Sequence, residues 1–434
     1  MRTLWPTVMM TLICVTAQAA QPPWAIYDRS PEHLWNRLYA AIAVRTEGGV
    51  DYGVDNSEPF HDSFDNPQKL ITILDEFLEK HGENRAPGTL RRALLLNDVW
   101  AAFDLTNTPE VGAEGTPLRR RLARVIARLR MQSPQISSLP DNYAQAVGST
   151  AFAADFDPEH PARPFLPPDL LDAQGQWVEI GADGEGAVAP FHVEILSGRS
   201  VFRVFIRCPG GRQATLAYLE TLNLYPTPWE LNPQDIGTSY PDRTKVRMRP
   251  LLLNHATPQF PPGTIVALVR QMMVINDELQ PVPTSITQKV QFRVFKDTGE
   301  PGRIDFNAHQ LVYELVMRRR DLLAGEKGGF HAVTPDEAEY QLTTQPMGVT
   351  REAHLRGVVV LSTCKRCHTA NGIFSVNTYS RTFSPAVAKD NTQLLPATSI
   401  GYQGNATALW KTSQFNWGVL RGLLEADVNA APRH

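Results

Sequence analysis

The sequence has few cysteines and little net charge. Four cysteines occur among 434 residues, and they are Cys14, Cys208, Cys364 and Cys367. An exported protein stabilised by disulfides usually has an even number of scattered cysteines, whereas two of these lie only three positions apart. A disulfide framework is therefore not expected. The net charge of −3 provides no strongly basic surface, so no nucleic acid partner is expected either.

Long apolar segments are also absent. No stretch of about eighteen apolar residues occurs, so we expect no transmembrane segment in the mature chain. Residues 1–20 contain one positive charge, a short apolar stretch from Val8 to Val15 and small residues at Ala17 and Ala19. This layout is typical of a secretory signal peptide. It predicts a bacterial protein that is periplasmic or otherwise exported.

The periodicity of apolar residues changes twice along the chain. Residues 21–150 contain several segments with helical spacing, of which 116–131 is the clearest. Residues 151–300 instead show the alternation typical of strands, as in 201–208. Helical patterns return in residues 301–434. The sequence therefore predicts an α+β multidomain protein, with a helical N-terminal domain, a β-rich middle domain and a mostly helical C-terminal domain.

Three local predictions concern the second half of the chain. The segment 191–205 is expected to form a β-hairpin that turns at Ser197 and Gly198. Residues 307–325 are expected to form one helix. A further helix is expected to lead from Thr350 into the cysteine-containing segment that follows.

That segment, LSTCKRCHTANG, contains Cys364, Cys367 and His368 in the order C-x-x-C-H. Two thiols with this spacing reach both vinyl groups of a haem from one turn of chain, and the histidine after them ligates the iron. Export supports this interpretation, because c-type haem is attached outside the cytoplasmic membrane. We therefore expect one covalent haem c on Cys364 and Cys367, with His368 as an axial iron ligand.

Other uses of the two thiols remain open at this point. A zinc site needs four ligands, and Cys208 could complete the set with Cys364, Cys367 and His368, although it lies in a different predicted domain. A thioredoxin-like thiol pair would need a strand before it and a helix after it. A disulfide between Cys364 and Cys367 would close a very short loop and contribute little stability. Cys208 itself is expected to be a buried free thiol.

Residues 350–434 resemble the class I cytochrome c family, most specifically in the C-x-x-C-H motif. In that family a short helix leads into the motif and the last helix packs across it. Gly357 lies on the incoming segment here, and Trp417 and Leu420 lie on the last predicted helix. The resemblance implies a cytochrome c-like C-terminal region and electron transfer to a redox partner protein. One departure is clear, because no methionine follows Cys364 to serve as the family's usual second axial ligand.

The sixth iron ligand must therefore come from elsewhere in the chain or be absent. Met347 lies in the loop-like stretch TTQPMGV, and His331 lies in GGFHAVTPDE. Met347 ranks slightly ahead, since a thioether ligand favours reduced iron and suits an electron carrier. His331 would give a bis-histidine haem of lower potential. An open coordination position is the third option.

Three functions are compatible with these features. The first is periplasmic electron transfer by a single haem. The second is a haem enzyme of peroxidase or oxidase type with an open iron site, for which His331 or His309 could act as a distal base. The third is a ligand-binding or adhesion protein with an accessory haem. The arginine-rich face of residues 116–131 could dock an acidic redox partner, although an ordinary solvated helix face is the simpler interpretation.

Overall fold

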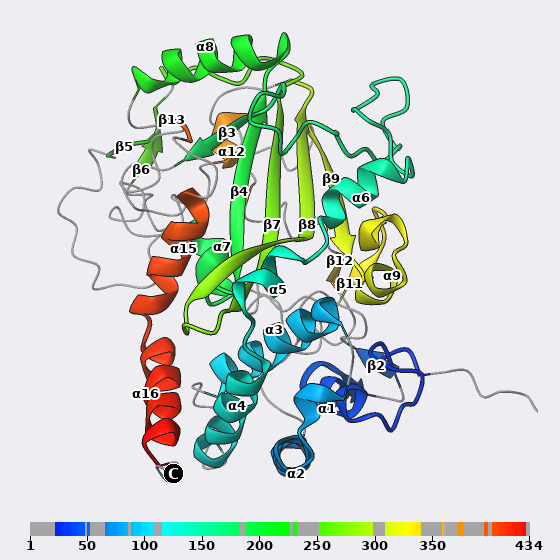
Figure 1. Ribbon diagram of the computed structural model, residues 1–434. Coiled ribbons are helices and arrows are strands. Elements are labelled where there is room, and N and C mark those ends of the chain that lie inside the picture. Colours follow the sequence, from blue (N-terminus) through cyan, green and yellow to red (C-terminus); the bar gives the residue numbers. More distant parts are fainter. Residues whose placement is uncertain are drawn as a thin grey trace, which may run out of the picture.

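The N-terminal part of the protein is helical in the computed structural model, as the sequence predicts (Figure 1). Asn66 caps one helix, because its side chain accepts a hydrogen bond from the amide of Lys69 at 2.8 Å. The elements are α1 (Leu34–Ala43), β1 (Arg45–Glu47), β2 (Val50–Tyr52), α2 (Pro67–Glu79), the 3-10 helix η1 (Gly82–Asn84), α3 (Thr89–Leu105), α4 (Gly115–Leu129), α5 (Ser133–Ser137) and α6 (Asn142–Gly148). The structure describes residues 22–47, 50–52, 66–85, 88–106, 115–181, 188–225, 229–231, 251–254, 256–297, 309–339, 358–359, 361, 368, 372–376, 395–397 and 402–430.

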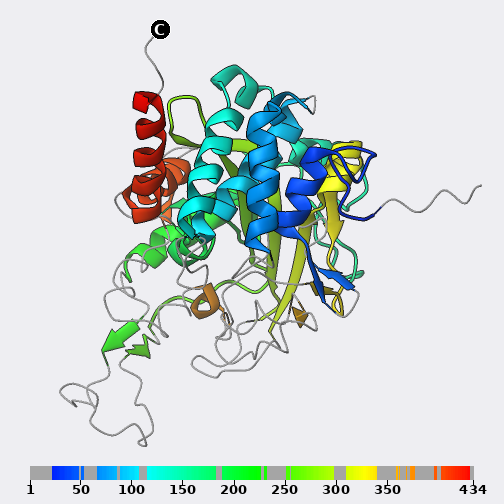
Figure 2. The same ribbon diagram turned by 90° about the horizontal axis from the view of Figure 1, so that it is seen from below.

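A seven-stranded sheet lies at the centre of the molecule, and all of its neighbouring strands are antiparallel. In spatial order the strands are β10 (Phe330–Ala332), β9 (Gln310–Met317), β8 (Pro281–Phe295), β7 (Ile265–Ile275), β4 (Ser200–Arg207), β3 (Val178–Gly181) and β13 (Leu395–Pro396). The register of β7 and β8 shifts after Arg270. Beyond this bulge, Met272 to Ile275 join the buried apolar cluster of α1–α4. Figure 2 shows these blue and cyan helices from below, lying across the ends of the strands.

The remaining elements surround the sheet. Helix α8 packs Leu219 and Leu222 into an apolar cluster with β3 and β4. The C-terminal helix α16 packs against α3, where the ring centres of Trp417 and Trp100 lie 5.8 Å apart. These elements are α7 (Pro190–Ile195), α8 (Gly211–Asn223), β5 (Trp229–Leu231), β6 (Leu251–Leu253), α9 (Arg319–Ala324), η3 (Lys327–Gly329), β11 (Ala338–Glu339), β12 (Val358–Val359), α12 (Ile373–Val376), α15 (Tyr402–Ser413) and α16 (Phe415–Ala430).

The hairpin predicted over residues 191–205 is wrong. Residues Pro190–Ile195 form helix α7, and only the part from Ser200 onward is a strand. Proline suits the first turn of a helix, and Gly198 adopts the left-handed conformation after its end, with φ of 68°. The alternation of apolar residues in this stretch also satisfies one helical face, so periodicity alone could not separate the two structures.

The single helix predicted over residues 307–325 is also wrong. Residues Gln310–Met317 form strand β9, and only Arg319–Ala324 is helical. Strand β9 pairs with β8 on one side and β10 on the other, and its apolar residues are nearly continuous. A strand buried on both faces lacks the alternation that identifies most strands. In the predicted helix before the motif, Val358–Val359 forms a strand instead.

The mixed α+β composition is confirmed. The helices of the N-terminal part and the sheet of the middle part are both present, and helices α15 and α16 end the described chain. The sheet also takes strands β9, β10 and β13 from beyond residue 300. The division into separate domains stays a prediction.

Candidate functional site

One face of the central sheet lies under the described residues of the C-x-x-C-H segment. We call it the motif face, and we define it by Val204, Leu268, Gln291 and Glu314, which are cross-strand neighbours on β4, β7, β8 and β9. Before the motif, Leu361 packs into an apolar cluster with β9. The motif segment is therefore seated on the sheet.

Two further contacts continue this seating across the strands. The side-chain amide of Gln310 on β9 donates a hydrogen bond to the carbonyl of His368 at 3.3 Å. After the motif, Ile373 is buried in the apolar cluster that contains Val204. Its backbone amide donates to the side chain of Gln259 at 3.2 Å. Strand β9 and the apolar end of the motif face thus fix the position of His368 from both sides.

A backbone carbonyl fixes the orientation and tautomer of the His368 ring. Its Nδ1 lies 2.7 Å from the carbonyl oxygen of Ser375 in α12. A carbonyl oxygen only accepts hydrogen bonds, so Nδ1 carries the proton and Nε2 presents its lone pair. The turn that brings Ser375 back to the ring passes through Gly372, whose φ is 54°. This arrangement is the one that orients metal-bound histidines, which makes Nε2 of His368 a fit ligand for haem iron.

The ring of a second histidine lies parallel to that of His368. The ring centres of His192 and His368 are 6.3 Å apart, and their planes differ by only 8°. His192 comes from α7, which lies far from the motif in the sequence. Its ring packs on Phe202 of β4, with the ring centres 5.2 Å apart. The fold therefore brings together two imidazoles from opposite ends of the site.

Both imidazoles are held in the neutral form. Burial lowers the pKa of His192 to about 4, and the positive charges of Arg293, Lys289 and Arg270 add to this effect. Burial and Arg293 also lower the pKa of His368 well below its usual value, while the hydrogen bond with Ser375 opposes the shift. Neutral imidazole is the form that binds metal ions.

Helix α7 is held in place by contacts at its end. The amide of Gly198 donates to the carbonyl of Val193 at 2.8 Å, which closes the helix. Phe202 packs with Val193 and Leu196 in a small buried cluster. A side chain at Gly198 would meet α15, because a Cβ atom there would lie 3.0 Å from a side-chain atom of Trp410. His192 thus lies on a short helix wedged between the sheet and α15.

The motif face is rich in positive charge near the two imidazoles. Arg293, Lys289 and Arg270 lower the pKa of His192 through their positive charge, and the carboxylate of Glu314 opposes them. The guanidinium of Arg293 donates to the side-chain oxygens of Gln291 and Gln310 at 3.3 and 3.2 Å. Lys289 forms an ion pair with Glu314 at 2.7 Å. Several described cations therefore lie close enough to act on His192.

The other predicted site residues lie in different places. Cys364, Cys367 and Met347 fall outside the described residues. On strand β10, Nε2 of His331 lies 2.9 Å from a carboxylate oxygen of Glu337. His331 is opposite Val316, six residues and about 20 Å along β9 from the residue that contacts His368. The structure therefore does not bring His331 and His368 together.

Two further candidates have other partners. His309 forms an ion pair with Asp297. Cys208 is a buried free thiol, as expected, and burial raises its pKa. Its backbone amide donates to the hydroxyl of Thr215 at 2.8 Å. Among the described residues, no group of three or more histidine, cysteine or acidic side chains is arranged to hold a metal ion.

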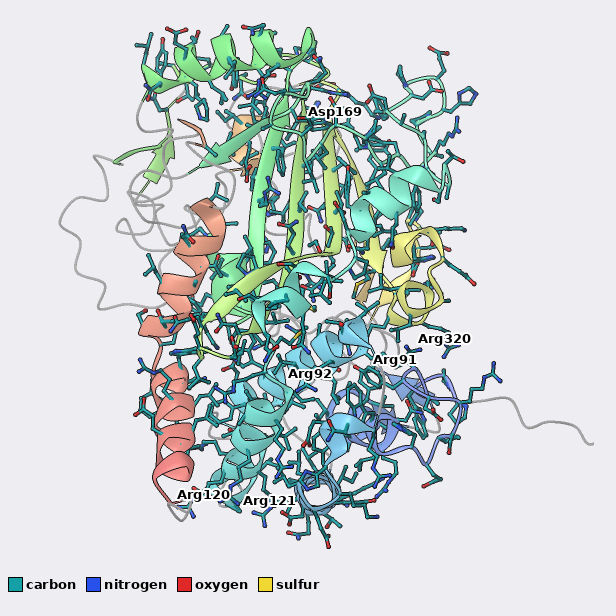
Figure 3. All side chains as sticks on the ribbon, viewed as in Figure 1. Arg91, Arg92, Arg120, Arg121, Asp169 and Arg320 are labelled. Atoms are coloured by element: carbon teal, nitrogen blue, oxygen red, sulfur yellow. The ribbon has the colours of Figure 1, made fainter. Side chains whose placement is uncertain are left out.

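Most of the arginine-rich face of α4 is tied to the protein itself. Arg121 forms an ion pair with Asp75 at 2.7 Å, and Arg128 forms one with Glu83 at 3.1 Å. Arg119 donates to the carbonyl of Thr106 at 2.8 Å. Figure 3 shows Arg120 and Arg121 at the lower end of the molecule, next to the end of α16. These contacts favour a structural role for the arginines over a dedicated docking surface.

Sequence reasoning missed His192. The histidine was assigned to a hairpin strand, where its position suggested no ligand role. Pro190 at the first helical turn and the Ser197-Gly198 pair after the last one are the signals for a short helix.

No helix among the described residues is long and apolar enough to cross a membrane. Comparisons with protein-family models, curated proteins and solved structures find no match to this chain.

Proposed function

We propose that this chain is an exported electron-transfer protein with one covalently attached haem c. Cys364 and Cys367 would form the thioether bonds, and His368 would be an axial iron ligand. A bound haem supplies one-electron chemistry between ferric and ferrous iron. Residues 1–20 would direct export to the periplasm, where a redox partner protein would exchange electrons with the haem.

One observation supports this proposal above the others. The motif histidine donates from Nδ1 to the carbonyl of Ser375 at 2.7 Å and presents Nε2 as a ligand. A disulfide role for the motif gives this histidine no reason to be oriented in this way, whereas a metal-binding role does. An iron-bound histidine has that reason, since the hydrogen bond fixes the ring and increases the basicity of the ligand.

Haem staining tests the proposal directly. The protein is produced in cells with an intact haem-attachment system, separated under denaturing conditions and stained. We expect a stained band from the parent and none from the double variant Cys364→Ala with Cys367→Ala. Cys208→Ala is the matched control and should retain the stain, because that buried free thiol is not part of the C-x-x-C-H sequence. A colourless parent band would end the proposal.

The mass of the intact periplasmic protein tests the export part. Cleavage near Ala19 or Ala20 is expected, and attached haem should add its own mass to the mature chain. A mature protein that still begins at Met1 would contradict the prediction of export while leaving the haem result to stand or fall separately.

A further inference from the structure

The imidazoles of His192 and His368 are spaced as two ligands of one metal. An imidazole nitrogen binds a first-row metal ion at about 2 Å and lies about 1.1 Å from the centre of its own ring, so two rings in line on one metal have centres roughly 6.2 Å apart. The observed separation is 6.3 Å, and the ring planes are parallel within 8°. Rings in direct face-to-face contact would have centres only about 3.5–4 Å apart, so the two imidazoles do not lie directly one above the other.

The surroundings of each ring support the same arrangement. The His368 ring is oriented by the carbonyl of Ser375, and the His192 ring is supported by Phe202 at 5.2 Å between centres. The two supports come from different parts of the chain, one from the motif segment and one from β4. Neither ring is a surface side chain that could adopt this separation by free rotation, since both are at least half-buried.

We propose that His192 is the second axial ligand of the haem iron, opposite His368. The inference rests on the proposed function, because it requires a haem at the motif. It replaces Met347 and His331 as the preferred sixth ligand, and it predicts a six-coordinate, low-spin, bis-histidine haem. Such a haem has no open position, so the function is electron transfer instead of peroxide or oxygen chemistry.

The ligand also explains why α7 is built into the site. A bis-histidine haem needs its two ligands held on opposite sides of the ring by separate parts of the chain. Helix α7 is fixed between β4 and α15 by Phe202 and by the close approach of Gly198 to Trp410. The motif segment is fixed on β9 and α12. Both elements lie on the motif face of the sheet, which therefore sets the distance between the two histidines.

Spectra of purified holoprotein test the inference. The parent should show a low-spin oxidised spectrum and its reduced form should not bind carbon monoxide. In His192→Ala we expect the haem stain to remain, the oxidised spectrum to become high-spin and the reduced protein to bind carbon monoxide. Added imidazole should fill the space left by the side chain and restore the low-spin spectrum, which a general loss of folding would prevent.

Two variants sharpen the result. His331→Ala is the matched control and should keep the parent spectrum. His192→Met keeps a ligating side chain, so it should stay low-spin with a higher reduction potential, even if His192→Ala does not fold. Two results overturn the inference while haem attachment stands. The stained parent could already be high-spin, or His192→Ala could stay low-spin and not bind carbon monoxide. An unstained parent overturns both.

Discussion

Two buried groups of charged side chains in this protein differ in their balance of charge. Near α3, Arg319 and Asp98 are fully buried and form a two-fold ion pair, to which the Tyr27 hydroxyl also donates at 3.1 Å. Around His192 on the motif face, the described groups that act on the imidazole include Arg270, Lys289, Arg293 and the carboxylate of Glu314. The first group joins one cation to one anion, and the second brings several described cations together.

The difference indicates two purposes. Burying a charge is costly unless an opposite charge compensates it, so the Asp98–Arg319 pair is explained by the fold it connects, from α3 to α9. A group of several cations next to the imidazoles would suit an anionic partner. A haem at the motif would bring two propionate carboxylates to a site that already contains Arg270, Lys289 and Arg293. Variants in each group test whether one stabilises the fold and the other acts on the haem site.

The largest effect is expected from breaking the balanced pair. Arg319→Met would leave the Asp98 carboxylate buried without its guanidinium partner. We expect the free energy of unfolding to fall by about 3–5 kcal/mol. Urea unfolding followed by circular dichroism measures it.

A surface ion pair provides the control for this variant. Arg121→Ala removes a pair whose Asp75 side chain is about half exposed, and it should cost less than about 1 kcal/mol. If Arg319→Met costs no more than Arg121→Ala, the buried pair does not stabilise the fold and the comparison fails.

A smaller effect is expected at the end of α7. Gly198→Ala would place a Cβ atom in the left-handed conformation and 3.0 Å from atoms of Trp410 and Lys411. We expect a loss of about 1–3 kcal/mol in stability. If His192 binds the iron, part of the haem should also become high-spin, because α7 is displaced.

Another glycine separates this effect from a general response to added side chains. Gly422 lies inside α16, and a Cβ atom there would meet no atom within 4 Å. Gly422→Ala should raise stability by about 0.5–1 kcal/mol, because alanine is the better helix former. If Gly198→Ala and Gly422→Ala reduce the free energy of unfolding equally, the contact between α7 and α15 does not explain the effect of Gly198→Ala.

The N-terminal helices could be predicted because their signals are local. Asn66 and Pro67 mark the start of α2, and its apolar stripe has one period throughout. Strand β9 could not be recognised, since burial on both faces removes the alternation that reveals a strand. Helix α7 was missed for a related reason, because six residues are too few for periodicity to decide.

The candidate site also combines residues with a local sequence signal and a residue without one. Cys364, Cys367 and His368 could be proposed as haem ligands because three chemically distinctive residues occur at fixed spacing. His192 could not be proposed, since nothing near it in the sequence shows that the sheet will place it 6.3 Å from His368. A ligand that depends on tertiary structure leaves no local pattern. Met347 ranks first on loop composition alone, and it lies outside the described residues.

The smallest effect on stability is expected from the motif face. Arg293→Gln removes one of three neighbouring positive charges and leaves polar partners at Gln291 and Gln310. The change in the free energy of unfolding should stay within about 1 kcal/mol, since relief of repulsion offsets the lost hydrogen bonds. The reduction potential of the haem should fall by on the order of tens of mV, because less positive charge near the iron favours the ferric form.

Arg203→Gln is the matched control on the opposite face of the sheet. Arg203 forms a two-fold ion pair with Glu179 at 2.8 Å, so its loss should reduce stability without moving the potential. Redox titration gives the reduction potential of each holoprotein, and urea unfolding gives its free energy of unfolding. Two results would contradict this expectation. Arg293→Gln could reduce the free energy of unfolding as much as Arg319→Met, or it could change the reduction potential no more than Arg203→Gln. In either case the positive charge of the motif face stabilises the fold and does not act on an anionic group near the two imidazoles.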